Sequence, residues 1–291
     1  MAHPSLRAAF QGGGFVLAPG VYDMISARIA DQAGFDALYV TGYGISASYL
    51  GLPDAGLASY TDMVGRVAQI AQGTGTPVIA DADTGYGGLL NVAHTVRGYE
   101  AAGVTAIQLE DQVFPKKCGH TPGRRVIPTA EMVRKLQVAQ EARMSEDFLI
   151  IARTDSRTAL GLDEALRRAE AYAAAGADLI FVESPESVDE LKAVAARIDK
   201  PLVANMVSGG LTPVLPAEEL QQIGYALVIH PGLGFLAAGE ALRRSYGELR
   251  ATGAVKQQPM HDFDAFCRSM GFEDVWEFDR RWAEPTDQAA E

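Results

Sequence analysis

The stretch EDQVFPKKCGHTPGRR, residues 110–125, brings two acids, four basic residues, a thiol and an imidazole together in sixteen positions. Cys118 and His120 could supply at most two ligands to zinc, and a soft sulfur beside carboxylates does not suit Mg²⁺. A buried, inert thiol is another reading, but the flanking cations Lys116 and Lys117 favour an exposed thiol whose pKa is lowered. We therefore predict that Cys118 is catalytic, with His120 and Lys117 beside it.

The glycines of this stretch suggest that it moves. Gly119 and Gly123 lie on either side of His120. Because the segment follows the fourth strand-like run, we expect it to overhang the end of the fold that carries the polar residues, and its closure would deliver the thiol to a substrate and exclude water.

Three acidic residues are candidate metal ligands. Asp81 and Asp83 belong to DADTGYG, and Glu110 opens the cysteine-containing stretch. Carboxylates crowded together repel one another unless a cation neutralises them, and a set of oxygens without histidine or cysteine favours Mg²⁺ or Mn²⁺. Alternatively, Asp81 and Asp83 only form and cap a turn. Asp111 could be a ligand or a residue that supports one.

Arg153 follows an almost continuous apolar run, where a guanidinium needs a carboxylate or phosphate partner. Glu183 could be that partner, either in a purely structural pair or while orienting Arg153 toward substrate. The TGYG turn offers backbone N–H groups around Gly42 for a carboxylate, with the Tyr43 hydroxyl nearby. A tight turn explains the same glycines equally well.

The elements that must position these residues alternate along the chain. Eight short apolar runs begin near residues 15, 36, 77, 106, 148, 178, 201 and 226. Their continuous apolar character is typical of parallel strands covered on both faces, and segments of helical period separate them. The helix-ending glycines at the strand entries are Gly34, Gly103, Gly176 and Gly224.

Eight such units predict an α/β fold of the (β/α)8 TIM-barrel type. An open doubly wound sheet is the alternative, but the first strand-helix junction lacks G-x-G-x-x-G. In a barrel the carboxyl ends of the strands form one mouth, so the polar residues that follow them should converge there. They are Thr41, Gly42, Tyr43, Asp81, Asp83, Glu110, Asp111, Arg153, Asp155, Glu183, Asn205 and His230.

The last forty residues form a separate feature. We predict a catalytic barrel over 1–251 and a helical extension over 252–291, with two short amphipathic helices rich in aromatic residues. The extension could pack on the outside of its own barrel, or it could be exchanged with a neighbouring subunit.

Charge and cysteine content narrow the partners. The net charge is −12 with lysines and arginines scattered, which argues against nucleic acid and against an acidic membrane surface. Two distant cysteines fit no disulfide framework and agree with a reducing compartment. The N-terminus has no signal-peptide pattern, and we expect a soluble, cytoplasmic protein that binds a small molecule.

At these residues the sequence resembles the isocitrate lyase and phosphoenolpyruvate mutase superfamily. The motifs run from YVTGYG through DADTGYG, LEDQVFPKKCGH, IARTD, VES and VAN to the helical tail. The resemblance implies a (β/α)8 barrel, Mg²⁺ or Mn²⁺, an α-oxygenated carboxylate substrate and a homotetramer with swapped C-terminal helices.

KKCGH is similar to the lyase branches, which comprise methylisocitrate, 2,3-dimethylmalate and petal-death-type lyases and the related oxaloacetate hydrolases. Phosphonate mutases typically carry an asparagine in this loop. Lys117, where methylisocitrate lyases more often have arginine, favours the dimethylmalate or petal-death branch. The HPGLGF stretch departs from the lyases, which more often have an aromatic residue at the position of His230.

Carried over to this chain, the resemblance assigns the metal to Asp81, Asp83 and Glu110 and the catalytic thiol to Cys118. The predicted substrate-binding set is Thr41, Gly42, Tyr43, Asp54, Gly119, His120, Arg153, Glu183 and Asn205.

The expected reaction is metal-dependent cleavage of a 2-hydroxy dicarboxylate, a substituted malate or a methylisocitrate, into an α-keto acid and a small carboxylate. Tyr43 or a metal-bound base would take the hydroxyl proton, Arg153, His120 and Lys117 would stabilise charge, and Cys118 would protonate the leaving carbon. The alternatives are oxaloacetate hydrolysis, phosphonopyruvate-type chemistry and a non-catalytic barrel that only binds metal and dicarboxylate.

Overall fold

The computed structural model describes residues 5–283, and its core is a barrel of eight parallel strands. The strands are β1 (Val16–Val21), β2 (Leu38–Val40), β3 (Val78–Asp81), β4 (Ala106–Glu110), β5 (Leu149–Thr154), β6 (Leu179–Val182), β7 (Val203–Asn205) and β8 (Leu227–His230). They pair in the order β6-β5-β4-β3-β2-β1-β8-β7. A parallel bridge between Ile180 and Leu202 and a 3.0 Å hydrogen bond from Ile180 N to Pro201 O connect the two ends.

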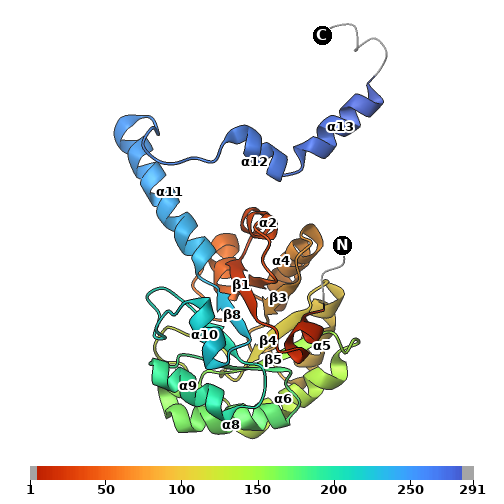
Figure 1. Cartoon of the computed structure of the whole chain (residues 1–291), viewed down its shortest axis with the longest axis vertical. Coiled ribbons are helices and arrows are strands. Elements are labelled where there is room, and N and C mark those ends of the chain that lie inside the picture. The colour runs from red at the N-terminus through yellow and green to blue at the C-terminus, as the bar shows by residue number, and fades with distance from the viewer. Residues whose placement is uncertain (1–4, 284–291) are drawn as a thin grey trace. The chain divides into compact units, whose positions relative to one another are not determined.

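This topology confirms the predicted barrel. The open doubly wound alternative is wrong because the bridge between Ile180 and Leu202 joins the two ends of the sheet. Helices surround the strands, as Figure 1 shows for α6, α8 and α9. They are α1 (Leu6–Gln11), α2 (Met24–Gln32), α3 (Gly42–Ile45), η1 (Ser46–Leu50), α4 (Tyr60–Gly73), α5 (Leu89–Ala101), α6 (Thr129–Ala142), α7 (Ser156–Leu160), α8 (Leu162–Ala174), α9 (Val188–Arg197), α10 (Ala217–Ile223) and α11 (Leu233–Thr252).

The glycines that precede β2, β4, β6 and β8 end their helices as predicted. Gly34, Gly103, Gly176 and Gly224 have φ values of 77°, 92°, 98° and 116°. This left-handed conformation is strained for residues with a Cβ, so glycine reverses the chain there from helix to strand.

The apolar residues of the strands divide between two cores. One cluster fills the inside of the barrel and includes Ile79, Ile151 and Phe181. The larger cluster lies between the strands and the helices and includes Val40 and Ile107. Because successive strand residues point to opposite faces, a parallel strand buried on both sides must be apolar throughout, and only its end is free to carry charge.

The chain divides into two compact units, 1–237 and 238–291. The second unit contains most of α11 followed by α12 (Phe263–Ser269) and α13 (Phe272–Trp282), so the two predicted short helices are confirmed. None of these three helices buries a residue, and Phe263, Phe278 and Trp282 are 80%, 55% and 67% exposed. The predicted boundary at 251/252 and the predicted exchange between subunits stay predictions.

Among residues 5–283, no helix combines the length and the apolar character needed to cross a bilayer.

Candidate active site

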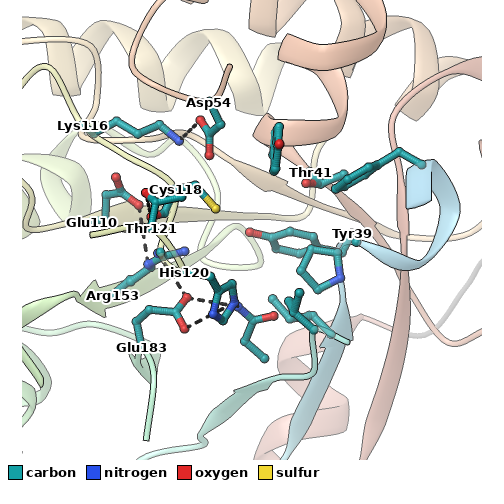
Figure 2. Close-up of a pocket in the computed structure, with 18 of the residues that line it drawn as sticks. Tyr39, Thr41, Asp54, Glu110, Lys116, Cys118, His120, Thr121, Arg153 and Glu183 are labelled. Carbon is teal, nitrogen blue, oxygen red and sulfur yellow. Dashed lines mark hydrogen bonds and ion pairs between the residues drawn. The ribbon is translucent and has the colours of Figure 1, made fainter. Parts of the chain in front are cut away.

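A cavity of about 240 Å³ opens at the carboxyl ends of the strands. Figure 2 shows Glu110, Lys116, Arg153 and Glu183 on one side of it and Tyr39 and Thr41 on the other, with the Cys118 sulfur between the two sides. The lining comprises Tyr39, Thr41, Tyr43, Asp54, Glu110, Lys116, Cys118, Gly119, His120, Thr121, Arg153, Glu183, Asn205, Val207, Ile229, Pro231, Gly232, Phe235 and Leu236. Most of the predicted site residues therefore meet at one mouth.

Lys116 anchors the segment after β4 inside this mouth. Its Nζ lies 2.5 Å from Asp54 Oδ1 and 2.7 Å from Asp83 Oδ1, and the side chain is 3% exposed. Burial alone would lower its pKa, but the carboxylates of Asp83 and Asp54 raise it well above its usual range. Lys116 is one of the cations predicted from the sequence to keep the thiol exposed, but two buried carboxylates draw its ammonium inward. Of the two neighbouring lysines, Lys117 is the exposed one.

The backbone of the loop is held by two side chains and by one backbone carbonyl. Gln112 pairs through its side-chain amide with both the N–H and the carbonyl of Lys117, at 3.0 and 2.8 Å. Ser184, directly after β6, donates to the Gly119 carbonyl at 3.1 Å, and Cys118 N donates to the carbonyl of Asp54 at 3.0 Å. The loop lies folded over the mouth.

Gly119 is required by close approach. A Cβ at this position would lie 2.3 Å from Arg153 Nη2 and 2.8 Å from Glu183 Oε2. Any side chain would push the loop off this ion pair, so the glycine lets the backbone beside Cys118 rest directly on it. The predicted role of Gly119 as a hinge stays a prediction.

Cys118 is half-buried and faces the cavity. Burial raises the pKa of the thiol and outweighs the lowering by Arg153 and Lys116. The predicted lowering of this pKa is therefore wrong, because the loop folds inward and buries the thiol, and because Lys116 is paired with the carboxylates of Asp54 and Asp83. The thiol is protonated at neutral pH, which suits a proton donor better than a nucleophile.

Arg153, at the end of β5, is surrounded by carboxylates. Its Nε and Nη2 donate to Asp155 at 2.9 Å each, and its Nη2 lies 3.1 Å from Glu183 Oε2. Glu110 Oε2 is 3.5 Å from Nε. Asp155 is thus the closest partner, although the sequence pointed to Glu183. Three carboxylates explain how a guanidinium only 7% exposed can remain charged at the end of an apolar strand.

The three predicted metal ligands are buried beside Lys116. Asp81 Oδ2 and Asp83 Oδ1 lie 2.8 and 3.6 Å from the point where a Cβ on Gly42 would stand, which explains why this position is glycine. Burial raises the pKa of Asp83 to about 7, although Lys116 opposes it. Burial also raises the pKa of Glu110 well above its usual value.

Within residues 5–283, no group of three or more histidine, cysteine or acidic side chains is arranged to hold a metal ion. The donor chemistry nevertheless fits a hard cation. In the part of the chain that the structure describes, buried Glu110 Oε1 has no hydrogen-bond partner, and Lys116 is the only cation that forms an ion pair with Asp83. An unpaired carboxylate oxygen in a low-dielectric site favours a cation. Asp81, Asp83 and Glu110 are therefore suitable ligands for Mg²⁺ or Mn²⁺, and their role stays a prediction.

A polar cluster beside the loop consists of His120, Asn205 and Glu183. Asn205 Nδ2 donates to Glu183 Oε2 at 3.0 Å and lies 3.3 Å from His120 Nε2. Burial lowers the pKa of His120, partly offset by Glu183, so the imidazole is neutral at pH 7. It can act by hydrogen bonding but is a poor source of positive charge, contrary to the expectation.

The residues of the TGYG turn contribute to the cavity in different ways. Thr41 caps α3 by accepting from Gly44 N at 3.4 Å, so one N–H group of the turn is already used. Tyr43 lines the cavity with 39% of its surface exposed, and its ring packs 5.1 Å from that of Phe235. The proposed carboxylate cradle stays a prediction.

Several residues are placed differently from the sequence prediction. The predicted residues that do not line the cavity are Gly42, Asp81, Asp83, Asp111, Lys117, Asp155 and His230, whereas Tyr39 does line it. Tyr39 lies within β2, and its hydroxyl donates to Gln108 at 2.9 Å inside the barrel. Nothing distinguished it in sequence from a core tyrosine. The apolar lining after β7 and β8 was also missed, because apolar residues at strand ends give no chemical signal.

Comparisons with known proteins agree with this geometry. The family model described as phosphoenolpyruvate phosphomutase matches residues 6–250. The 2,3-dimethylmalate lyase of Eubacterium barkeri is 48% identical, with 92% of this chain and 93% of that protein covered. The 2-methylisocitrate lyase of Bacillus subtilis is 40% identical, covering 84% and 80%. A solved structure of oxaloacetate acetylhydrolase with 3,3-difluorooxalacetate has a TM-score of 0.91 at 35% identity, covering 96% of each chain.

The chain belongs to the phosphoenolpyruvate mutase/isocitrate lyase superfamily, which confirms the resemblance read from its motifs. It is an enzyme, and its similarity to named lyases over most of its length places it among the carbon-carbon lyases.

Proposed function

We propose that this enzyme cleaves the C2–C3 bond of a substituted malate, a 2-hydroxy dicarboxylate, into an α-keto acid and a small carboxylate. For 2,3-dimethylmalate the products would be pyruvate and propionate. The observation that carries the proposal is the position of the Cys118 thiol, which faces a cavity that Glu110, Arg153 and Glu183 also line. Burial raises the pKa of the thiol, so it can act as a proton donor. The 48% identity to 2,3-dimethylmalate lyase supports the substrate class.

The reaction requires one proton to leave and one to arrive. The C2 hydroxyl loses its proton, the C2–C3 bonding electrons move to C3, and C2 becomes the keto carbon. The Cys118 thiol then donates its proton to C3, which completes the second carboxylic acid. A protonated donor facing C3 is the group that such a step needs.

The remaining residues have distinct parts in this proposal. Tyr43 lines the cavity, and its phenolate form would accept the hydroxyl proton and become the neutral phenol. Arg153, fixed by Asp155 and Glu183, would stabilise negative charge on the fragment that becomes the carboxylate. His120 and Asn205 would bind a substrate oxygen by hydrogen bonding, beside Thr41, Gly42, Asp54 and Gly119.

We infer that Asp81, Asp83 and Glu110 hold Mg²⁺ or Mn²⁺. When bound, the ion would polarise the hydroxyl and the adjacent carboxylate of the substrate. The unpartnered Glu110 Oε1 supports this inference.

The central test is Cys118→Ser, because serine keeps the size of the side chain but is a far weaker acid. We expect kcat to fall at least about 100-fold, within the range of general acid-base catalysis. Pyruvate release from 2,3-dimethylmalate with Mg²⁺, coupled to lactate dehydrogenase, measures it. The matched control is Cys267→Ser in α12, the other cysteine of the chain. Turnover close to wild type in Cys118→Ser would remove the thiol from the mechanism.

Hydrolysis of oxaloacetate to oxalate and acetate is the second candidate. It is supported by the TM-score of 0.91 to oxaloacetate acetylhydrolase. With oxaloacetate as the substrate, release of oxalate would identify the hydrolase. With a substituted malate as the substrate, release of pyruvate identifies the lyase.

We also propose that the exposed apolar side chains of α12 and α13 are covered by a second copy of the chain within a homotetramer. Their exposure supports this, because a soluble chain rarely leaves such a patch uncovered. Light scattering after gel filtration measures the oligomer size. Cytoplasmic localisation stays a prediction.

A further inference from the structure

The loop after β4 ends in a buried arginine to which the proposed reaction gives no part. Arg124 is 6% exposed, whereas its neighbour Arg125 is exposed. Neither residue lines the cavity. Burying a guanidinium is costly unless a carboxylate or another acceptor pairs with it, so the partners of Arg124 indicate what it does.

Arg124 contacts two residues that follow β5. Its Nη1 donates to Asp155 Oδ1 at 2.8 Å, and its Nη2 donates to Thr158 Oγ1 in α7 at 2.7 Å. Asp155 is fully buried and Thr158 is exposed. The arginine therefore joins the end of the loop that carries Cys118 to the segment that directly follows Arg153.

Asp155 also binds the guanidinium of Arg153. Its Oδ1 accepts from Arg153 Nη2 and its Oδ2 accepts from Arg153 Nε, each at 2.9 Å. Oδ1 is shared, because Arg124 Nη1 donates to the same atom. Burial alone would raise the pKa of Asp155, but the two guanidinium groups lower it, so the carboxylate is charged and can hold both.

The shared carboxylate restricts how Arg153 can turn. A bidentate pair fixes the plane of a guanidinium relative to its carboxylate, and Arg124 in turn restrains the carboxylate of Asp155. Arg153 lines the cavity together with Cys118, and its Nη2 lies 3.1 Å from Glu183 Oε2. Without Arg124, the side chain of Asp155 would be free to rotate and to take the guanidinium of Arg153 with it.

We propose that Arg124 is a positioning residue, which acts through Asp155 to hold Arg153 and the loop that carries Cys118 in one fixed arrangement. The consequence for turnover rests on the proposed lyase function, whereas the hold on the loop does not. Preorganised charges and a correctly placed proton donor lower the barrier of such a reaction. Loss of Arg124 should therefore lower kcat more than it raises KM.

Arg124→Met tests the effect on turnover. Arg125→Met is the matched control, because it removes the same charge from an exposed position of the same loop. With 2,3-dimethylmalate and Mg²⁺, we expect kcat per folded molecule to fall about 10-fold or more in Arg124→Met, because a misplacement of roughly 1 Å can cost about 100-fold. It should not change in Arg125→Met. Equal kcat values in the two variants would overturn the proposed action on Arg153.

Two further variants separate positioning from a purely structural role. Arg124→Lys should recover only part of the lost kcat, since an ammonium lacks the planar fork that reaches Asp155 and Thr158 together. Adding Arg124→Met to Asp155→Asn should lower kcat by no more than about 2-fold beyond Asp155→Asn alone, because the two residues act as one unit. Additive losses contradict the proposal. So does a loss of stability in urea with kcat per folded molecule unchanged.

The rate at which iodoacetamide alkylates Cys118 is a readout that does not require turnover. In a Cys267→Ser background, Cys118 is the one cysteine left in the chain. Because Arg124 holds the end of the loop, Arg124→Met should raise this rate about 10-fold or more above that of Arg125→Met, as expected when a hydrogen bond to a charged group is lost. Equal rates in the two variants would overturn the proposal.

These alkylation rates also keep the two hypotheses apart. If the wild-type protein cleaves no substituted malate, the proposed function is wrong, and the rates still decide whether Arg124 holds the loop. Thr158→Ala, at an exposed position, removes one of the two contacts of Arg124 and replaces Arg124→Met in this comparison if circular dichroism shows that Arg124→Met is unfolded.

Discussion

Glu110 and Asp111 are adjacent buried acids at the end of β4, and they have opposite environments. Asp111 is 0% exposed, and both of its oxygens are hydrogen-bonded. Its Oδ1 accepts from the backbone N–H of Asp155 at 2.9 Å. Its Oδ2 accepts from three side chains, Thr154 Oγ1 at 2.8 Å, Arg168 Nη1 at 3.0 Å and Tyr172 OH at 2.7 Å.

Glu110 is as deeply buried, at 1% exposure, but is incompletely paired. Its Oε2 lies 3.5 Å from Arg153, outside the distance of a good hydrogen bond, and Oε1 has no hydrogen-bond partner. Successive residues at a strand end point to opposite faces, so Glu110 lines the cavity while Asp111 faces the helices. A satisfied buried charge supports the fold, and an unsatisfied one is available for a ligand.

The largest effect that would sharpen this comparison is on stability. Asp111→Asn would weaken the pairing of the buried Arg168 guanidinium, and we expect the free energy of unfolding to fall by about 3 to 5 kcal/mol, as when one partner of a buried pair is removed. Urea denaturation followed by circular dichroism measures it. Asp199→Asn, at an exposed position after α9, should change stability by less than about 0.5 kcal/mol. A loss as small in Asp111→Asn would refute its structural role.

Glu110→Gln should produce the converse result. We expect kcat/KM to fall about 100-fold or more, the scale of losing one preorganised electrostatic contact. Stability should be kept, because the change removes a poorly paired buried charge. Turnover and the Mg²⁺ concentration for half-maximal rate are measured together.

Glu219→Gln in α10, on an exposed position, is the matched control for Glu110→Gln and should leave both quantities unchanged. The distinction between the two acids breaks down if Glu110→Gln destabilises the protein as much as Asp111→Asn while turnover per folded molecule is kept.

The smallest expected effect concerns His230, which ends β8 but does not line the cavity. Burial lowers its pKa below 6.5, so the folded protein holds it neutral. The unfolded state then binds more protons below pH 6.5, and this contribution to stability is complete above pH 6.5 and is lost as the pH falls through the folded pKa. His230→Asn should flatten the dependence of unfolding free energy on pH between 5 and 7 without changing kcat/KM. An unchanged slope would contradict the structural role predicted for His230. A fall in kcat/KM would show that His230 acts in the site, as Glu110 does, and not only in the fold, as Asp111 does.

The fold could be predicted from local pattern. Eight apolar runs, four of them preceded by a helix-ending glycine such as Gly103 or Gly176, predict repeated βα units. The pairing of β1 with β8 and the bridge between Ile180 and Leu202 confirm that they form a barrel. The convergence of Arg153, Glu183 and Asn205 followed from the same rule, because parallel strands place their carboxyl ends at one mouth.

The charge state of the loop could not be predicted from its neighbours in sequence. Lys116 and Lys117 are adjacent, yet Lys116 is buried between Asp54 and Asp83 and Lys117 is exposed. Burial of the thiol itself raises the pKa of Cys118, and that burial depends on the fold and not on neighbours in sequence.

By itself, the sequence determined that polar residues after the strands gather at the barrel mouth, since strand period and helix-ending glycines are local properties of the chain. Only the tertiary structure decided which of two neighbouring acids is paired, which lysine is buried, and which apolar residues face the cavity. Those outcomes depend on partners from distant strands, as with Asp111 and Arg168, and no local pattern contains them.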